Sequence, residues 1–109
     1  MNLKGNKLDY YERKAVEILE KKGFTNIRKV AKRSEESFDL TAENEGIKYC
    51  IEVKGTGQIG VMGRYIVPSH ELKALYMHYL LKDRERALLM FVDDYNNYCI
   101  FQMVDGFMA

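Results

Sequence analysis

Three residues in the middle of the chain have the types and spacing that metal-assisted hydrolysis requires: Asp39, Glu52 and Lys54. Mg²⁺ prefers hard oxygen ligands such as carboxylates, and a bound divalent cation lowers the pKa of a coordinated water molecule. A lysine beside two carboxylates can orient that water and stabilise the negative charge that develops in the reaction. Residues of these types are able to hold a divalent cation and support hydrolysis, provided that the fold brings them together.

Two consecutive predicted strands carry the three residues. Residues 47–54 are rich in β-branched and aromatic side chains, and residues 38–42 form a second apolar segment interrupted by one acidic residue. The segment between them reads as a hairpin turn, in which Gly46 can take a positive φ. Side chains alternate along a strand, so the Glu and the Lys of the later strand share one face. Pairing the strands therefore brings Asp39 near Glu52.

The segment 9–22 predicts the first helix, with Asn6 or Asp9 as its N-cap and Gly23 at its end. Its apolar residues recur at helical spacing and form the expected buried face: Tyr11, Ala15, Val16, Ile18 and Leu19. Glu12 lies at the edge of that face. It is interpreted either as a further site residue or as a surface carboxylate paired with a neighbouring lysine.

An Asp followed by Glu-x-Lys on the next strand resembles the catalytic signature of the PD-(D/E)XK nuclease superfamily. In this chain the signature is Asp39, Glu52 and Lys54, with Phe38 in the place of a proline that carries no chemistry. Many members have a Glu on the first helix that helps to hold the metal, and by position that residue is Glu12. The resemblance spans roughly residues 9–103.

The resemblance implies a metal-dependent endonuclease that hydrolyses DNA phosphodiester bonds with Mg²⁺, for which Mn²⁺ can substitute. It implies metal ligation by Asp39, Glu52 and the Val53 carbonyl, a further contact from Glu12, and a Lys54 that positions the attacking water. The chain looks similar to archaeal Holliday junction resolvases, which are small homodimers, and equally to small restriction-like domains. The first similarity implies a homodimer.

Other interpretations of the same residues stay open. A Glu-x-Lys pattern on a strand also arises as a cross-strand ion-pairing pattern on a solvated face. The combination with a preceding Asp, a first-helix Glu and the order of the elements favours the nuclease. The remaining function classes are a module that binds nucleic acid or a partner without cutting, and a nuclease directed at RNA.

The net charge is only +1, but its distribution is uneven. Residues 1–36 hold ten basic and six acidic residues, whereas residues 37–109 hold seven basic and ten acidic ones. Basic clusters can follow a phosphate backbone, although a solvated surface explains them equally well. The glycine-rich stretch 55–63 is expected to border a DNA cleft. The residues predicted to contact DNA are Lys29, Lys32, Arg33, Gln58 and Arg64.

The remaining pattern predicts the fold class. Further strands are expected over 24–32, 64–67, 87–92 and 98–104, and a second helix begins at Pro68–Ser69. The prediction is one α/β (α+β) domain over 1–109, with a restriction-endonuclease-like core. Its mixed five-stranded sheet is flanked by two helices in the order α-β-β-β-α-β-β.

Several classes of protein are not expected from this composition. No apolar run approaches membrane-spanning length, and the chain does not open on a signal peptide. Cys50 and Cys99 read as reduced thiols of a cytoplasmic protein, and His70 and His78 lack a metal-ligand pattern. The glycine-rich stretch lacks the spacing of a dinucleotide loop, so no organic cofactor is expected.

Overall fold

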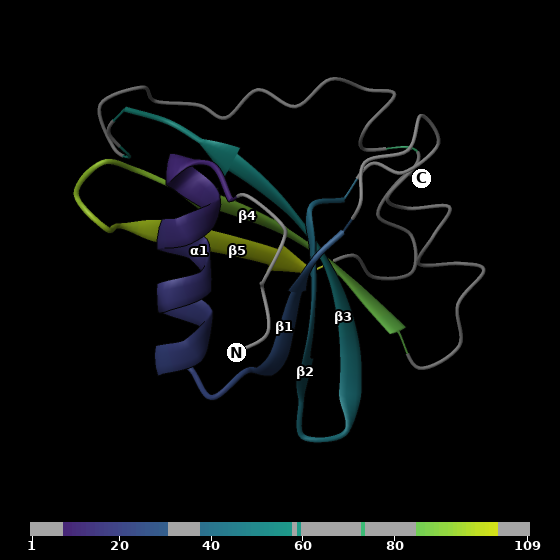
Figure 1. Ribbon diagram of the computed structural model, residues 1–109. Helices are drawn as coiled ribbons and strands as arrows, with labels where there is room; N and C mark the ends of the chain where they lie inside the picture. Colours follow the sequence, from purple (N-terminus) through teal and green to yellow (C-terminus); the bar gives the residue numbers. More distant parts are fainter. Residues whose placement is uncertain (1–7, 31–37, 58, 60–72, 74–84, 103–109) are drawn as a thin grey trace.

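The computed structural model describes residues 8–30, 38–57, 59, 73 and 85–102, which form one helix against a five-stranded sheet (Figure 1). The elements are α1 (Tyr10–Lys21), β1 (Thr25–Lys29), β2 (Leu40–Asn44), β3 (Ile47–Gly55), β4 (Glu85–Val92) and β5 (Tyr98–Gln102). The strands lie in sequence order across the sheet. Only β3 and β4 are parallel, and the other neighbours are antiparallel. The predicted α+β class and mixed sheet are confirmed.

Local sequence signals fix both ends of α1. The Glu12 N–H donates to Asp9 Oδ1 at 2.7 Å, and Glu12 Oε1 accepts from the Asp9 N–H at 3.0 Å, which completes a capping box. At the other end Gly23 has a φ of 94°, and the Phe24 N–H donates to the Leu19 carbonyl at 3.0 Å. The Gly23 N–H also donates to the Glu20 carbonyl at 3.1 Å, which completes a Schellman motif. The predicted stop at Gly23 is confirmed, and of the two predicted caps the structure shows Asp9.

A two-residue turn sets the register of the central hairpin. Glu45 and Gly46 have φ values of 52° and 79°, and Asn44 pairs with Ile47 across the turn. Two successive positive φ values characterise the type I′ turn, whose twist matches that of paired strands. The predicted hairpin is therefore confirmed, and its register follows from the turn: Leu40 lies opposite Ile51.

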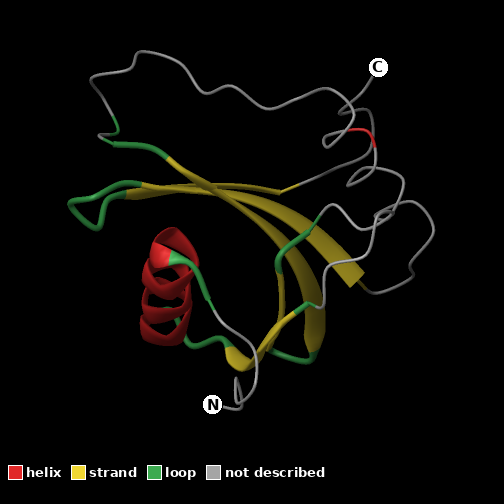
Figure 2. Cartoon of the chain, turned by 45° about the horizontal axis from the view of Figure 1, so that its top comes forward, coloured by secondary structure: helices red, strands yellow, loops and turns green. Residues whose placement is uncertain are grey.

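The two faces of the sheet are packed differently. The α1 face, against which the helix lies, carries the main core: Ala15, Val16, Ile18, Leu19, Phe24, Ile27, Leu40, Ala42, Ile51, Val53, Leu88, Met90 and Val92 (Figure 2). The opposite face carries a smaller cluster of Ala87, Leu89 and Phe91, with Phe38, Ile59 and Cys99 packed against it. Strand β4 is thus buried on both faces, as its continuous apolar run predicts.

Some predicted elements differ in length or lie outside the described residues. Strand β1 covers Thr25–Lys29, and residues 31–32 of the predicted strand 24–32 lie outside the described residues. The pairing of β1 with β2 shifts register between Thr25 and Arg28. The predicted strand 64–67 lies outside the described residues. Of the predicted second helix only Lys73 is described. Cys50 and Cys99 are thiols and form no disulfide.

No helix in the described part of the chain is long and apolar enough to span a membrane.

Candidate active site

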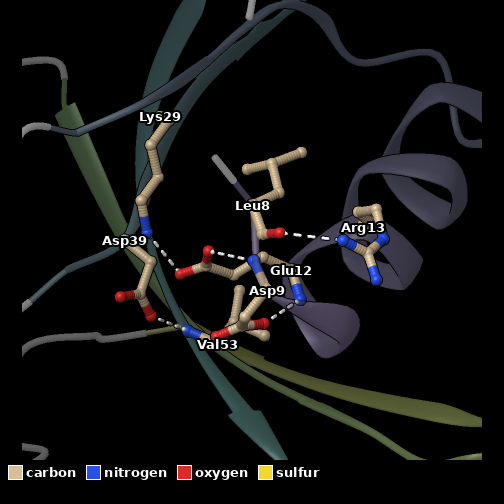
Figure 3. A network of polar contacts seen from close by, with 7 residues as sticks. All are labelled: Leu8, Asp9, Glu12, Arg13, Lys29, Asp39 and Val53. Atoms are coloured by element: carbon tan, nitrogen blue, oxygen red, sulfur yellow. Dashed lines mark hydrogen bonds and ion pairs between the residues drawn. The ribbon is translucent and has the colours of Figure 1, made fainter. Parts of the chain in front are cut away.

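Asp39 lies just before β2 and extends the β2–β3 ladder with its side chain. Its N–H donates to the Ile51 carbonyl at 2.8 Å, and its Oδ2 accepts from the Val53 N–H at 2.9 Å (Figure 3). Its own carbonyl accepts from the Val30 N–H at 2.9 Å, which ties it to the chain after β1. Asp39 is only 5% exposed. The carboxylate thus replaces a backbone acceptor at the point where β2 begins, and its position is fixed from two sides.

Glu52 and Lys54 lie on the next strand, on the opposite face from α1. Within the β3–β4 register Glu52 is beside Leu89 and Lys54 is beside Phe91, two members of the opposite-face cluster. Glu52 is 6% exposed and Lys54 is half-buried. Glu52 also follows Ile51, the partner of Leu40, so it lies next to Asp39 at the start of the hairpin ladder.

The Val53 backbone lies beside both predicted carboxylates: it follows Glu52 in the chain, and its N–H bonds to Asp39. Its side chain belongs to the main core on the α1 face, while its N–H bonds to Asp39. In an antiparallel ladder the N–H and the C=O of one residue point to the same neighbouring strand. The Val53 carbonyl is therefore on the Asp39 side of β3. The predicted group Asp39, Glu52 and Val53 is contiguous in the fold.

Both oxygens of the Glu12 carboxylate have partners within the protein. Its Oε1 serves the capping box, and its Oε2 pairs with Lys29 Nζ at 2.6 Å (Figure 3). The two side chains are 5% and 12% exposed. Lys29 lies opposite Leu40 in the β1–β2 register and so faces α1. The structure therefore joins Glu12 to Lys29 on the α1 face, whereas Glu52 and Lys54 are on the opposite face.

The other residues predicted to contact DNA are not placed: Lys32, Arg33, Gln58 and Arg64 lie outside the described residues. Among the residues that are described, no three His, Cys, Asp or Glu side chains form a group that could hold a metal ion. A cation at the hairpin would therefore use Asp39 and Glu52 together with backbone oxygen and water. This donor set consists of hard oxygens and fits Mg²⁺, which usually keeps several waters.

A further buried carboxylate, Asp93, was predicted only as part of a turn. Its Oδ1 accepts from the N–H groups of Tyr95 and Asn97 at 2.8 Å each. Its Oδ2 accepts from the Ile59 N–H and from Asn97 Nδ2, at 3.0 Å each. Burial alone raises the pKa of Asp93, but these four hydrogen bonds outweigh it and lower the pKa to about 2.

The Asp93 network anchors the segment after β3 to the β4–β5 turn. The Thr56 N–H donates to the Val92 carbonyl at 3.0 Å, and the Asp94 N–H donates to the Gly57 carbonyl at 3.3 Å. The hydrogen bond between the Tyr11 hydroxyl and Asp94, aided by burial, raises the pKa of Tyr11. The Tyr11 ring lies against Gly55, where any added Cβ would collide with it. The helix, residues 55–57 together with Ile59, and the β4–β5 turn are thus joined beside the end of β3.

The sequence contains a signal for this anchor. Asp and Asn side chains after a strand commonly bond backbone N–H groups two or more residues ahead, and residues 93–97 read Asp-Asp-Tyr-Asn-Asn. The pattern does not predict the bond to Ile59, because that partner is distant in sequence.

Comparisons with known proteins supply no family for this chain: no protein-family model matches it, and a search of curated proteins found no match.

The first prediction concerns acid stability. The ionised form of Asp93 stabilises the fold fully above its ordinary pKa of 3.8, and this contribution is lost as the pH falls through about 2. Asp93→Asn should lower the urea midpoint at neutral pH. Between pH 3.8 and about 2, the midpoint of this variant should fall less steeply than the midpoint of the parent. Urea unfolding across the acid range measures both effects. Glu45→Gln, in the exposed turn, is the control and should keep the parent's decline; an equal decline in Asp93→Asn would contradict the assignment.

The second prediction concerns the Glu12–Lys29 pair. Glu12→Gln keeps the capping acceptor but removes the charge that faces Lys29, and Lys29→Met removes the cation while keeping the stem. A double-mutant cycle should give a coupling free energy of about 1.5 to 3 kcal/mol, as expected for a charged hydrogen bond shielded from water. Urea unfolding of the four proteins measures it. Additive effects of the two substitutions would show that the pair contributes nothing to stability.

Proposed function

We propose that the chain is a metal-dependent endonuclease that hydrolyses DNA phosphodiester bonds, with Asp39, Glu52 and Lys54 as its catalytic group. The observation that carries the proposal is the hydrogen bond from the Val53 N–H to Asp39 Oδ2, at 2.9 Å. It holds the Asp carboxylate against the Glu-x-Lys strand, which is the arrangement that the sequence motif requires. The motif's position on a hairpin within a mixed sheet supports the same proposal.

The burial of the two carboxylates supports a cation between them. Asp39 and Glu52 are almost completely buried, and they lie one residue beyond Leu40 and Ile51, the pair at the end of the β2–β3 ladder. Neighbouring ionised carboxylates repel each other, and burial raises the cost of both charges. A divalent cation offsets that cost, and the Val53 carbonyl offers a further oxygen on the same side. Mg²⁺, with Mn²⁺ as a substitute, is the proposed metal.

Each residue then has a defined task in hydrolysis. Asp39 and Glu52 would hold the cation, and the chemistry that it would supply is a water of lowered pKa and neutralisation of charge on the phosphate. Lys54 shares the face of Glu52, and its ammonium group orients the water and stabilises the negative charge of the transition state. Glu12 is assigned to positioning, because through Lys29 it fastens β1 to the helix beside Asp39.

Strand scission also implies an assembly. One such site cuts one strand, so cutting both strands of a duplex calls for two copies, and we propose a homodimer in the cytoplasm. A monomer in light scattering at high protein concentration, unchanged by added DNA, would contradict this part of the proposal.

A module on the same fold that binds nucleic acid without cutting is the second candidate. The observation that favours it is the pairing of Glu12 with Lys29, which engages the carboxylate that the superfamily resemblance assigns to metal. An RNA-directed nuclease with the same catalytic group is tested by the same substrates.

The third prediction tests catalysis directly. The parent should cut labelled duplex, single-stranded or four-way-junction DNA with Mg²⁺ or Mn²⁺, and chelation should stop it. Lys54→Ala should slow cleavage roughly a hundredfold or more, because it removes a charge that acts mainly on the transition state. Asp39→Asn keeps an oxygen for the Val53 N–H but loses charge, so it should require more Mg²⁺. Gel analysis of cleavage against metal concentration measures both.

Lys48→Gln provides the matched control, since Lys48 is an exposed lysine at the start of the same strand. It should cut at the parent's rate. Equal cleavage by Lys54→Ala would overturn the catalytic assignment, and binding without cleavage in either metal would favour the binding module. Cleavage of an RNA strand in preference to DNA would reassign the substrate.

A further inference from the structure

A hollow of about 320 Å³ lies between α1 and the β4–β5 hairpin, away from the catalytic group. Figure 1 shows this hairpin running beside the helix. The hollow's volume lies at the lower end of the range for small-molecule sites, so it suits a ligand of one ring system. The residues that line it are Glu17, Ile18, Lys21, Lys22, Asn96 and Tyr98.

The fold creates this hollow because β5 is an edge strand that α1 does not cover completely. Tyr98 pairs with Val92, a main-core residue, so its side chain lies on the α1 face. It is nevertheless 41% exposed. On the helix, Glu17 and Lys21 are four residues apart and share a stripe that borders the hollow. The hollow therefore has one wall from the helix and one from the hairpin.

Two contacts hold polar and aromatic groups at the rim. Lys14 Nζ donates to Asn96 Oδ1 at 2.6 Å, so the contact uses the oxygen of the Asn96 amide and not its nitrogen. Asn96 has a φ of 64°, a conformation that asparagine tolerates better than most residues. Lys22 Nζ lies 5.5 Å from the centre of the Tyr98 ring. The turn and the end of the helix thus present defined groups to the hollow.

The chemistry of the lining suits an anionic ligand with an aromatic ring. Two lysines, Lys21 and Lys22, line the hollow against a single acidic residue, Glu17. Tyr98 offers an aromatic surface, and Ile18 offers an apolar one. The Asn96 amide and the Glu17 carboxylate supply a donor and an acceptor for the edge of a base. The lining thus offers a group for each part of a nucleotide: its phosphate, the face of its base and the edge of its base.

We propose that this hollow binds one unpaired nucleotide of a single-stranded nucleic acid, with its base on Tyr98 and its flanking phosphates at Lys21 and Lys22. Stacking on aromatic side chains beside basic groups is the common mode of single-strand binding, and it needs a base face that a duplex does not expose. The site is distinct from the Asp39 group, so it stands whether or not the protein cuts its ligand. In the nuclease it would hold a strand that leaves the duplex.

The fourth prediction uses fluorescence anisotropy with a labelled mixed-sequence DNA 12-mer, measured in chelator so that no strand is cut. Tyr98→Leu should weaken binding about fivefold or more, whereas Tyr98→Phe should bind like the parent, because only the second keeps the ring. Lys21→Gln with Lys22→Gln should lower the slope of log affinity against log salt by about 0.7 per lysine. Circular dichroism confirms that each variant is folded.

Lys48→Gln controls for charge alone and should leave the affinity and salt slope nearly unchanged. Equal binding by Tyr98→Leu and Tyr98→Phe, or an unchanged salt slope in the double lysine variant, would overturn the proposal. Tighter binding of the matching duplex, or a mononucleotide that binds as well as the 12-mer, would overturn the single-strand assignment. These measurements are independent of cleavage: Tyr98 dependence without cutting refutes the nuclease alone, and Lys54-dependent cutting without Tyr98 dependence refutes this site alone.

Discussion

The hydrogen bond between the Val53 N–H and the Asp39 carboxylate joins the architecture of the sheet to its proposed chemistry. Strand β2 begins at Leu40, so the ladder would leave this N–H without a backbone acceptor, and the aspartate side chain supplies one. A buried N–H without a partner is costly, and a charged acceptor makes a stronger bond than a neutral one. The same constraint places a carboxylate beside Glu52, so stability and the proposed chemistry depend on one contact.

The sheet divides the charged residues into two groups with different roles. On the α1 face, Glu12 completes the helix cap and pairs with Lys29, so it links the start of the helix to β1. On the opposite face, Glu52 and Lys54 lie among apolar neighbours of β4. Asp39 lies between these two groups, at the end of the sheet where β2 begins. The proposed catalytic group therefore combines one residue at a strand end with two residues from the face opposite α1.

The β4–β5 hairpin is held to the residues after β3 by a buried carboxylate of a different kind. Asp93 is completely buried, yet it is stabilised as a carboxylate because backbone and side-chain donors surround it. Its bond to Ile59 fixes the chain beyond β3 to the β4–β5 turn, and Tyr11 reaches the same turn through Asp94. This anchoring also sets the position of Asn96 and Tyr98, which border the hollow beside α1.

The sequence determined the elements whose signals are local: the Asp9 cap and Gly23 stop of α1, the Glu45–Gly46 turn, and the alternation that puts Glu52 with Lys54. The turn type in turn fixed the strand register, so the neighbourhood of Asp39 and Glu52 was predictable. Tertiary structure decided the rest. Besides their local bonds, Glu12 and Asp93 each have a partner distant in the chain, as Asp39 does, and the choice of that partner depends on how the strands and the helix pack. Local patterns hold no information on such pairings, because burial of polar groups is settled only when whole elements pack together.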